Sequence, residues 1–222
     1  MSGAVARARR SLAKDLPGLS LSMHVAAEWA DDPAALEACR AEIEQGDLII
    51  AHMLFMENHI EPVLPWLERR RMECDAMIGC MSASPVAQLT RMGRFEMNGD
   101  ETSVFSRLRG LRKSKKEGGT PGARQAAMLR RVPQILRFIP GTAQDVRAYL
   151  LTMQYWLAGS DRNVEHMIRF LVNRYADGPR RGLRGRVKAD LPVEYPDVGV
   201  YHPRLPGGLA GTSDRLPGAR RK

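Results

Sequence analysis

Helical and strand-like apolar patterns alternate along residues 1–93. Helical spacing occupies residues 3–16, 33–45, 57–72 and 84–92. Strand-like patterns occupy residues 19–26, 47–55 and 74–82. The first of these alternates apolar and polar positions, and the other two are short continuous apolar runs, which are typical of strands covered on both faces. This order predicts an α/β fold, with a layered domain built on a parallel sheet.

The pattern begins with a helix, whereas an open α/β domain usually begins with a strand. We therefore expect a strand before Met1, and the sheet as given to lack its first strand. The helix over residues 3–16 should end at Pro17-Gly18. Its Arg-rich and acid-free start superficially resembles a transit peptide, and a surface helix is the alternative.

The remainder of the chain divides into three further segments. Residues 94–120 are rich in Gly and Lys and predict a basic mobile loop. Residues 121–177 have helical spacing throughout and predict a helical subdomain, in which Thr142 and Asp145 resemble a capping box. Residues 178–222 predict a basic linker, one short strand at 198–201, and the start of a truncated next domain with a disordered tail.

Charge is distributed unevenly along the chain, whose formal net charge is +9. Residues 94–131 and residues 178–222 each hold ten basic and four acidic residues, and the remainder is mildly acidic. A nucleic-acid role is therefore the weakest hypothesis, because the excess lies in expected loops and no aromatic residue interrupts the run at 107–116. A solvated loop, or one that docks on an acidic protein surface, is the preferred interpretation.

The common motifs of self-contained chemistry are missing from the sequence. There is no phosphate-binding Gly-Lys loop, dinucleotide fingerprint, zinc pattern or nucleophile elbow. The three cysteines, Cys39, Cys74 and Cys80, are odd in number and wrongly spaced for a zinc knuckle, so we interpret them as buried, reduced, intracellular thiols. No apolar run approaches the ~20 residues of a membrane helix, which predicts a soluble protein. We assign no catalytic residue and no metal ligand.

Two pairs of residues are candidates for ligand binding. His52 ends one predicted strand and His59 begins the next helix, so both could reach the carboxyl edge of the sheet, where α/β domains place ligands. Ser82 and Ser84 occupy the matching position after the next strand, at a helix start that could hold an anion. The alternatives are structural histidines and simple N-capping serines.

Four stretches carry a resemblance to a known family. They are GDLIIAHMLFMENHIEPVLPWLERRR, CDAMIGCMSASPVAQLTRMGRFEM, ILRFIPGTAQDVRAYLLTMQYWLAGSDRNVEHMIRFLVNRYA and YPDVGVYHPRLP. Between about Leu19 and Pro206 the sequence resembles the N-terminal region of the large, porphyrin-binding (H) subunit of magnesium chelatase, and less closely that of cobalt chelatase. The block IPGTAQDVRAYLLTMQYWLAGSDRNV is the most specific part of this likeness.

The resemblance implies a component of chlorophyll or bacteriochlorophyll synthesis, located in the cytoplasm or in the plastid stroma. In that family the large subunit binds protoporphyrin IX, and two ATPase-type subunits drive insertion of Mg²⁺ with ATP. Mg²⁺ and ATP are thus used by the full complex, and we expect no cofactor on this chain. The family's porphyrin cavity lies mainly outside the matched region, so a fragment that is inactive alone is expected. The alternative is a non-catalytic interaction module that docks partner ATPase subunits.

Overall fold

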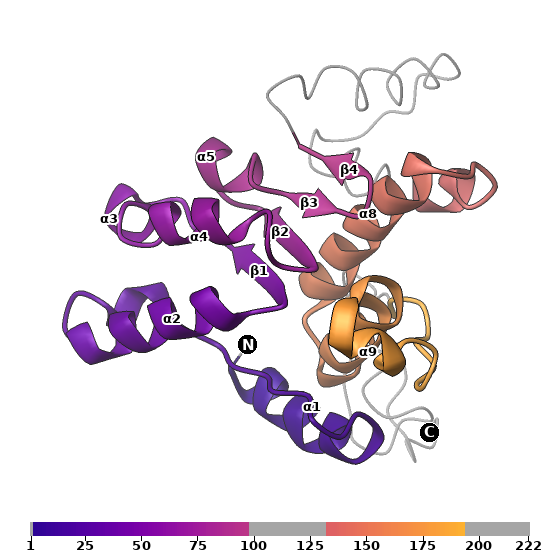
Figure 1. The fold of residues 1–222 in the computed structure, drawn as a ribbon, viewed down its shortest axis with the longest axis horizontal. Coiled ribbons are helices and arrows are strands. Elements are labelled where there is room, and N and C mark those ends of the chain that lie inside the picture. The colour runs from indigo at the N-terminus through magenta and orange to yellow at the C-terminus, as the bar shows by residue number, and fades with distance from the viewer. Residues whose placement is uncertain (1, 98–131, 194–222) are drawn as a thin grey trace, which may run out of the picture.

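The computed structural model describes residues 2–97 and 132–193 (Figure 1). The first part contains α1 (Ser2–Asp15), η1 (Ala26–Glu28), α2 (Pro33–Gln45), β1 (Leu48–His52), α3 (Glu57–Ile60), α4 (Leu64–Arg70), β2 (Ala76–Cys80), α5 (Ser84–Ala87), β3 (Arg91–Met92) and β4 (Phe95–Glu96). The second part contains a helical turn at 132–136 and then α8 (Thr142–Ala158), α9 (Asp161–Tyr175) and η2 (Gly178–Leu183).

Within the described residues, four strands form one sheet in the order β1-β2-β3-β4. β1 and β2 are parallel, from the pair Leu48↔Ala76 to the pair His52↔Cys80, while β2-β3 and β3-β4 are antiparallel. The predicted α/β fold is confirmed, and the sheet is mixed because a hairpin follows its parallel pair. Gly93 closes that hairpin with φ 59°, a left-handed conformation that glycine adopts without strain.

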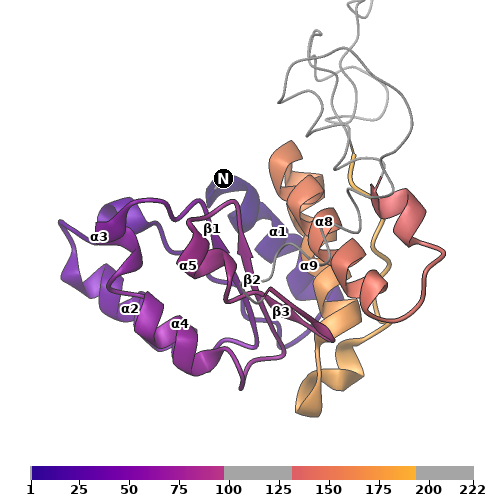
Figure 2. The same ribbon diagram turned by 90° about the horizontal axis from the view of Figure 1, so that it is seen from above.

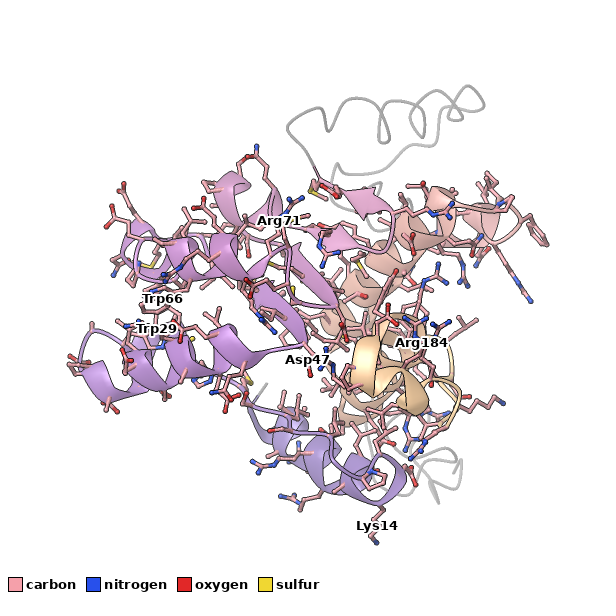
Figure 3. All side chains as sticks on the ribbon, in the orientation of Figure 1. Lys14, Trp29, Asp47, Trp66, Arg71 and Arg184 are labelled. Carbon is pink, nitrogen blue, oxygen red and sulfur yellow. The ribbon has the colours of Figure 1, made fainter. Side chains whose placement is uncertain are left out.

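Helices cover both faces of the sheet, as Figure 2 shows, with α2 to α5 on one side and α1, α8 and α9 on the other. On the first face, Ala51 and Met77 pack with buried residues of the helices, among them Cys39, Ile43 and Leu67. Trp29 and Trp66 pack against the same cluster, and Figure 3 shows them on the side of α2 and α4.

The second face is the larger core. Ala76, Ile78 and Cys80 of β2 contact a buried set from the hairpin, the turn at 132–136, α8 and α9. A separate cluster joins α1 to α9 through Leu12, Leu16 and their neighbours. The Arg-rich start of the chain is therefore a packed helix, with Ala4, Val5 and Ala8 buried.

A backbone group and a side chain complete the packing around Gly79 of β2. A Cβ at this position would lie 2.1 Å from the Val86 carbonyl oxygen, so only glycine lets α5 approach the strand this closely. Thr90 Oγ1 accepts a hydrogen bond from the Gly79 N–H (3.0 Å) and donates one to the Gly79 carbonyl (3.2 Å). The hydroxyl thus pairs with β2 just before β3 begins.

Three predicted elements differ from the structure. Residues 19–25 form no strand, because no described segment pairs with them, and Leu19 and Leu21 pack instead on the α1–α9 cluster. The helix expected over 57–72 is divided into α3 and α4 at Pro62, which has no N–H to continue the hydrogen-bond ladder. The helix expected from Ser84 to Met92 ends at Ala87, where the chain turns into the hairpin.

The predicted capping box is also wrong. The N-cap of α8 is Gly141, without a side-chain cap, and Asp145 points into tertiary contacts instead. By contrast, Ser160 caps α9 by accepting a hydrogen bond from the Asn163 N–H, as expected.

The stretch 178–186, interpreted from its sequence as a linker, contains η2, and Arg180 there pairs with Asp47 (3.1 Å) and Asp75 (3.2 Å). The basic run 107–116, the short strand at 198–201 and the tail lie outside the described residues. Within the described part of the chain, no helix is both long enough and apolar enough to span a bilayer.

Candidate functional site

The carboxyl ends of β1 and β2 are joined by hydrogen bonds of the backbone and of the Ser82 side chain. The Met53 N–H donates to the Met81 carbonyl (3.1 Å), and the Leu54 N–H donates to Ser82 Oγ (3.1 Å). Ser82 in turn donates to the Cys80 carbonyl (3.2 Å). The sequence-predicted Ser82 therefore lies at the expected edge, and its hydroxyl holds the two loops together.

Two residues at this edge have left-handed backbone conformations that side chains rarely adopt. Met53 has φ 59° and Met81 has φ 47°, and each directly follows a strand. Such conformations cost of order 1 kcal/mol or more and concentrate at functional sites. They turn the backbone sharply at the same end of the sheet, after β1 and after β2.

His52 lies at the end of β1 against Trp156 of α8. The two ring centroids are 4.6 Å apart with an interplanar angle of 60°. His52 Nε2 and Trp156 Nε1 are both buried, and neither has a hydrogen-bond partner among the described residues. Burial lowers the pKa of His52 to about 4, so the imidazole is neutral at physiological pH.

Three large apolar side chains are exposed in the loop that follows His52. Met53, Phe55 and Met56 are 57%, 56% and 58% exposed. Contiguous apolar exposure of this kind marks binding surfaces more often than free solvent-facing surface. The edge combines apolar contact area with two buried nitrogen atoms, which suits the binding of an apolar group with polar edges.

The structure does not bring the other two candidates to this place. His59 contacts Trp29 edge-on, with centroids 6.4 Å apart, on the α2 face of the sheet. His52 contacts Trp156 on the opposite face, so the two histidines are separated by the sheet. Ser84 is exposed and accepts a hydrogen bond from the Gln88 side chain (3.1 Å) inside the four-residue α5.

A second feature, a pocket of about 700 Å³, lies at the opposite ends of the strands, beside Cys74 and Asp75 just before β2 and Gly93 in the hairpin. Asp145 reaches it from α8 and accepts hydrogen bonds from the Arg94 N–H, the Arg174 guanidinium and the Tyr175 hydroxyl, each at 3.0 Å. A Cβ on Gly93 would lie 2.8 Å from this carboxylate. Asp145 thus joins the hairpin to both long helices.

The charges around this pocket balance one another. Asp75 pairs with Arg180, and Asp177 pairs with Arg184 at 3.6 Å. Figure 3 shows Asp47 and Arg184 at this edge. Arg91 donates to the carbonyl oxygens of Arg71 and Cys74. Because these groups already have partners, the pocket is better suited to holding the helices on the sheet than to binding a charged ligand.

Sequence reasoning missed both Trp156 and Asp145. Trp156 sits in a helical stripe that indicates core packing, and Asp145 sits in a spacing that indicates a cap. The sequence features closest to the role of Asp145 are Gly93 and the neighbouring residues Arg174 and Tyr175. Their connection becomes visible only once the structure places the β3-β4 hairpin.

The cysteines are buried, and none forms a disulfide. Burial raises the pKa of Cys39 to about 11 and that of Cys80 to about 12, so both remain protonated thiols. Among residues 2–97 and 132–193, no group of three or more His, Cys, Asp or Glu side chains could hold a metal ion.

Comparison with known proteins places this geometry in a family. Residues 1–150 match the family described as "Domain of unknown function (DUF3479)", which is more than half of the chain. The chain belongs to the DUF3479 family. In this DUF3479 chain the match includes the sheet and the first half of α8, whereas Trp156 and the α9 residues that line the pocket lie beyond it.

Longer relatives of the DUF3479 chain carry a functional name. It is 45% identical to the magnesium-chelatase H subunit of Cereibacter sphaeroides and 40% identical to that of Rhodobacter capsulatus, in each case over 97% of the chain and 18% of the relative. It is 29% identical to the chloroplastic magnesium-chelatase ChlH subunit of Oryza sativa subsp. indica, over 85% of the chain and 13% of the relative. The chain therefore spans less than a fifth of the length of these relatives.

Proposed function

We propose that the chain acts as the N-terminal region of a magnesium-chelatase large subunit, the subunit that presents protoporphyrin IX for ATP-dependent insertion of Mg²⁺. The observation that carries this proposal is the 45% identity to the Cereibacter subunit, which extends over 97% of the chain. In the full complex, ATP is used by two partner ATPase subunits, and the reaction contributes to chlorophyll or bacteriochlorophyll synthesis.

The geometry supports a binding role for this region. Around His52 and Trp156 the carboxyl edge offers exposed apolar side chains and a neutral imidazole, and these suit contact with a flat apolar macrocycle. No general acid or base is paired with His52 among the described residues. We therefore assign His52 to porphyrin contact, with Ser82 shaping the loops, and place the metal insertion step elsewhere in the subunit.

A chimera tests the proposal. The matched region of the Cereibacter subunit is replaced by this chain, and Mg-protoporphyrin formation is followed by fluorescence with the two ATPase subunits, Mg²⁺ and ATP. We expect activity well above that of a subunit from which the region has been deleted. A chimera no more active than the deletion contradicts the proposal.

A matched pair of variants in the same chimera tests the site. His52→Ala should raise the Kd for protoporphyrin IX about tenfold, which corresponds to about 1.4 kcal/mol. His59→Ala, on the opposite face against Trp29, should leave the Kd unchanged. Equal effects of the two substitutions would remove the carboxyl edge from porphyrin binding.

A second candidate function is a docking module for the ATPase subunits. The basic excess of residues 94–131 and 178–222 favours it, because such segments suit an acidic protein surface. Deletion of residues 106–119 should then weaken a pull-down of the ATPase subunits by the chimera. Retention of the ATPase subunits after the deletion would exclude residues 106–119 from this role.

A further inference from the structure

Two methionines at the carboxyl edge present their side chains to solvent. Met53 and Met56 are 57% and 58% exposed, and Phe55 between them is 56% exposed. Two more methionines of the described residues are exposed, Met23 at 37% and Met72 at 66%, and Met72 lines the pocket at the opposite ends of the strands. The carboxyl edge therefore combines two accessible methionine side chains with an aromatic ring in one short loop.

The backbone between the two methionines is held at both ends. The Met53 N–H donates to the Met81 carbonyl (3.1 Å), and the Met56 carbonyl accepts from the His59 N–H (2.9 Å) where α3 begins. Leu54, between them, packs inward on the cluster that covers the α2 face of the sheet. Because the main chain is fixed and Leu54 takes the inward position, the exposure of Met53 and Met56 is built into the fold.

The thioether of methionine has two properties that matter at such a position. It is soft and polarisable, and it makes favourable contacts with aromatic rings. It is also oxidised reversibly to a sulfoxide, which is polar and chiral and disrupts apolar contacts. Since exposure to solvent decides which methionines a dissolved oxidant reaches, Met53 and Met56 are open to this chemistry.

The oxidation needs only a hydroperoxide as co-reactant. A lone pair of the sulfur attacks one peroxide oxygen, so that an S–O bond forms and the O–O bond breaks. With hydrogen peroxide, the departing hydroxide takes the proton of the new S–OH group and leaves as water. The sulfur loses two electrons and the peroxide gains them, so each methionine consumes one peroxide and yields one sulfoxide and one water.

We propose that Met53 and Met56 are a reversible oxidation site that controls the carboxyl edge. As thioethers they offer an aromatic ligand an apolar surface beside Phe55. As sulfoxides they place two polar oxygen atoms on that surface, and an apolar ligand must strip water from them in order to bind. The N–H groups of Met53 and Leu54 already have acceptors, so neither is available to the new oxygen atoms. Oxidation therefore closes the edge. That the ligand is a porphyrin rests on the proposed function.

Mass spectrometry of the peroxide-treated chain tests the oxidation site itself. Hydrogen peroxide is added, the reaction is stopped with catalase, and the sulfoxide at each methionine is followed over time in peptides. We expect Met53 and Met56 to oxidise at least about tenfold faster than Met77 and Met167, which are 1% and 2% exposed. Methionine sulfoxide reductases A and B with a dithiol should restore both, while the dithiol is oxidised to a disulfide. Rates as slow as those of the buried methionines would overturn the proposal.

Matched variants of the chimera test the effect on binding. M53Q/M56Q replaces both thioethers with polar amides of similar length and should raise the Kd for protoporphyrin IX about fivefold without any peroxide. M53L/M56L keeps an apolar surface, so it should bind like the unmodified chimera and lose less affinity on peroxide treatment. M72Q is the control, because Met72 is at least as exposed but lies at the opposite ends of the strands, and it should leave the Kd unchanged. Circular dichroism checks that each variant folds.

The outcomes separate this proposal from the proposed function. If M53Q/M56Q binds like M72Q while His52→Ala weakens binding, polar groups at the two positions do not close the edge, and the proposal is overturned. An equal loss of affinity on peroxide treatment in M53L/M56L and in the unmodified chimera assigns the effect to other methionines and overturns it as well.

A third outcome concerns the ligand alone. If neither His52→Ala nor M53Q/M56Q changes the Kd, porphyrin binding at this edge is refuted. The apolar dye anilinonaphthalene sulfonate then decides the oxidation proposal on the chain itself. M53Q/M56Q should bind less dye than M72Q, and equal dye binding by the two variants overturns the proposal.

Discussion

At the scale of single residues, the sequence located half of the candidate site. His52 and Ser82 could be placed because each follows a short apolar run, and the carboxyl ends of parallel strands meet at one edge. His59 could not, because the direction of α3 is set by the division of the helix at Pro62 and by contact with Trp29. Trp156 comes from a helix far later in the chain, and no local pattern connects it to His52.

The desolvated imidazole of His52 predicts a pH dependence of stability. Its pKa is about 4 in the folded chain and about 6.5 when unfolded, so the unfolded chain binds the proton first as the pH falls. The stability that depends on a neutral His52 is fully present above pH 6.5 and is lost as the pH falls towards 4. Since the side chain is only partly buried, we expect a loss of roughly 1–2 kcal/mol.

Urea unfolding at pH 7 and pH 5 gives the change in the free energy of unfolding between the two pH values. This change is compared between the unmodified chain and a variant without His52. The unmodified chain should lose more stability between the two pH values than the variant His52→Phe. His166→Gln serves as a comparison, because burial lowers the pKa of His166 as well, so this variant should also lose a part of the pH dependence. Parallel stability curves for the unmodified chain and His52→Phe would show that His52 titrates normally.

At the scale of elements, long apolar patterns were predicted well and short ones poorly. β1, β2, α2, α8 and α9 lie where the sequence placed them. The two-residue strands β3 and β4 have no period to detect, and they exist because Gly93 turns the chain and Met92 and Phe95 are buried under α8. The role of Asp145 depends on that hairpin, and so it was mistaken for a cap.

Asp145 should therefore be a stability residue that acts between elements. Asp145→Ala removes the acceptor for the Arg94 N–H, Arg174 and Tyr175 and leaves a half-buried guanidinium without its carboxylate. We expect a loss of about 3 kcal/mol in the free energy of unfolding, measured by urea titration with circular dichroism. Glu44→Ala, which removes a surface pair with Arg40, should cost far less. Similar losses would contradict a linking role for Asp145.

At the scale of the whole molecule, the two halves of the described chain share one core. The boundaries at 93 and 121 stay a prediction, but buried residues of β2 and the hairpin lie in the same cluster as those of α8 and α9. The sequence could not show this, because helical spacing indicates an apolar face without saying what that face covers. A sheet face covered by distant helices should not unfold separately from them.

The three tryptophans allow a test of this cooperativity. Trp29 and Trp66 report on the α2 face, and Trp156 reports on the α8 face. Urea unfolding is followed by tryptophan fluorescence in a W29F/W66F variant and in a W156F variant, and each midpoint is corrected for that variant's change in stability, measured by circular dichroism. The two corrected midpoints should be the same. Two separated midpoints would show that the helical half unfolds as its own domain.

The hydroxyl of Thr90 has a consequence for how sequence variation at this position should be judged. It both donates to and accepts from the main chain of Gly79 and is fully buried, so it serves as an extra peptide group of the sheet. Valine has almost the same shape but would leave the Gly79 N–H without its partner and the Gly79 carbonyl with the Tyr149 hydroxyl alone, whereas serine is smaller and keeps both hydrogen bonds. A substitution ranked as conservative by volume is therefore the damaging one here. What matters at this position is whether the side chain keeps an oxygen atom that can both donate and accept a hydrogen bond.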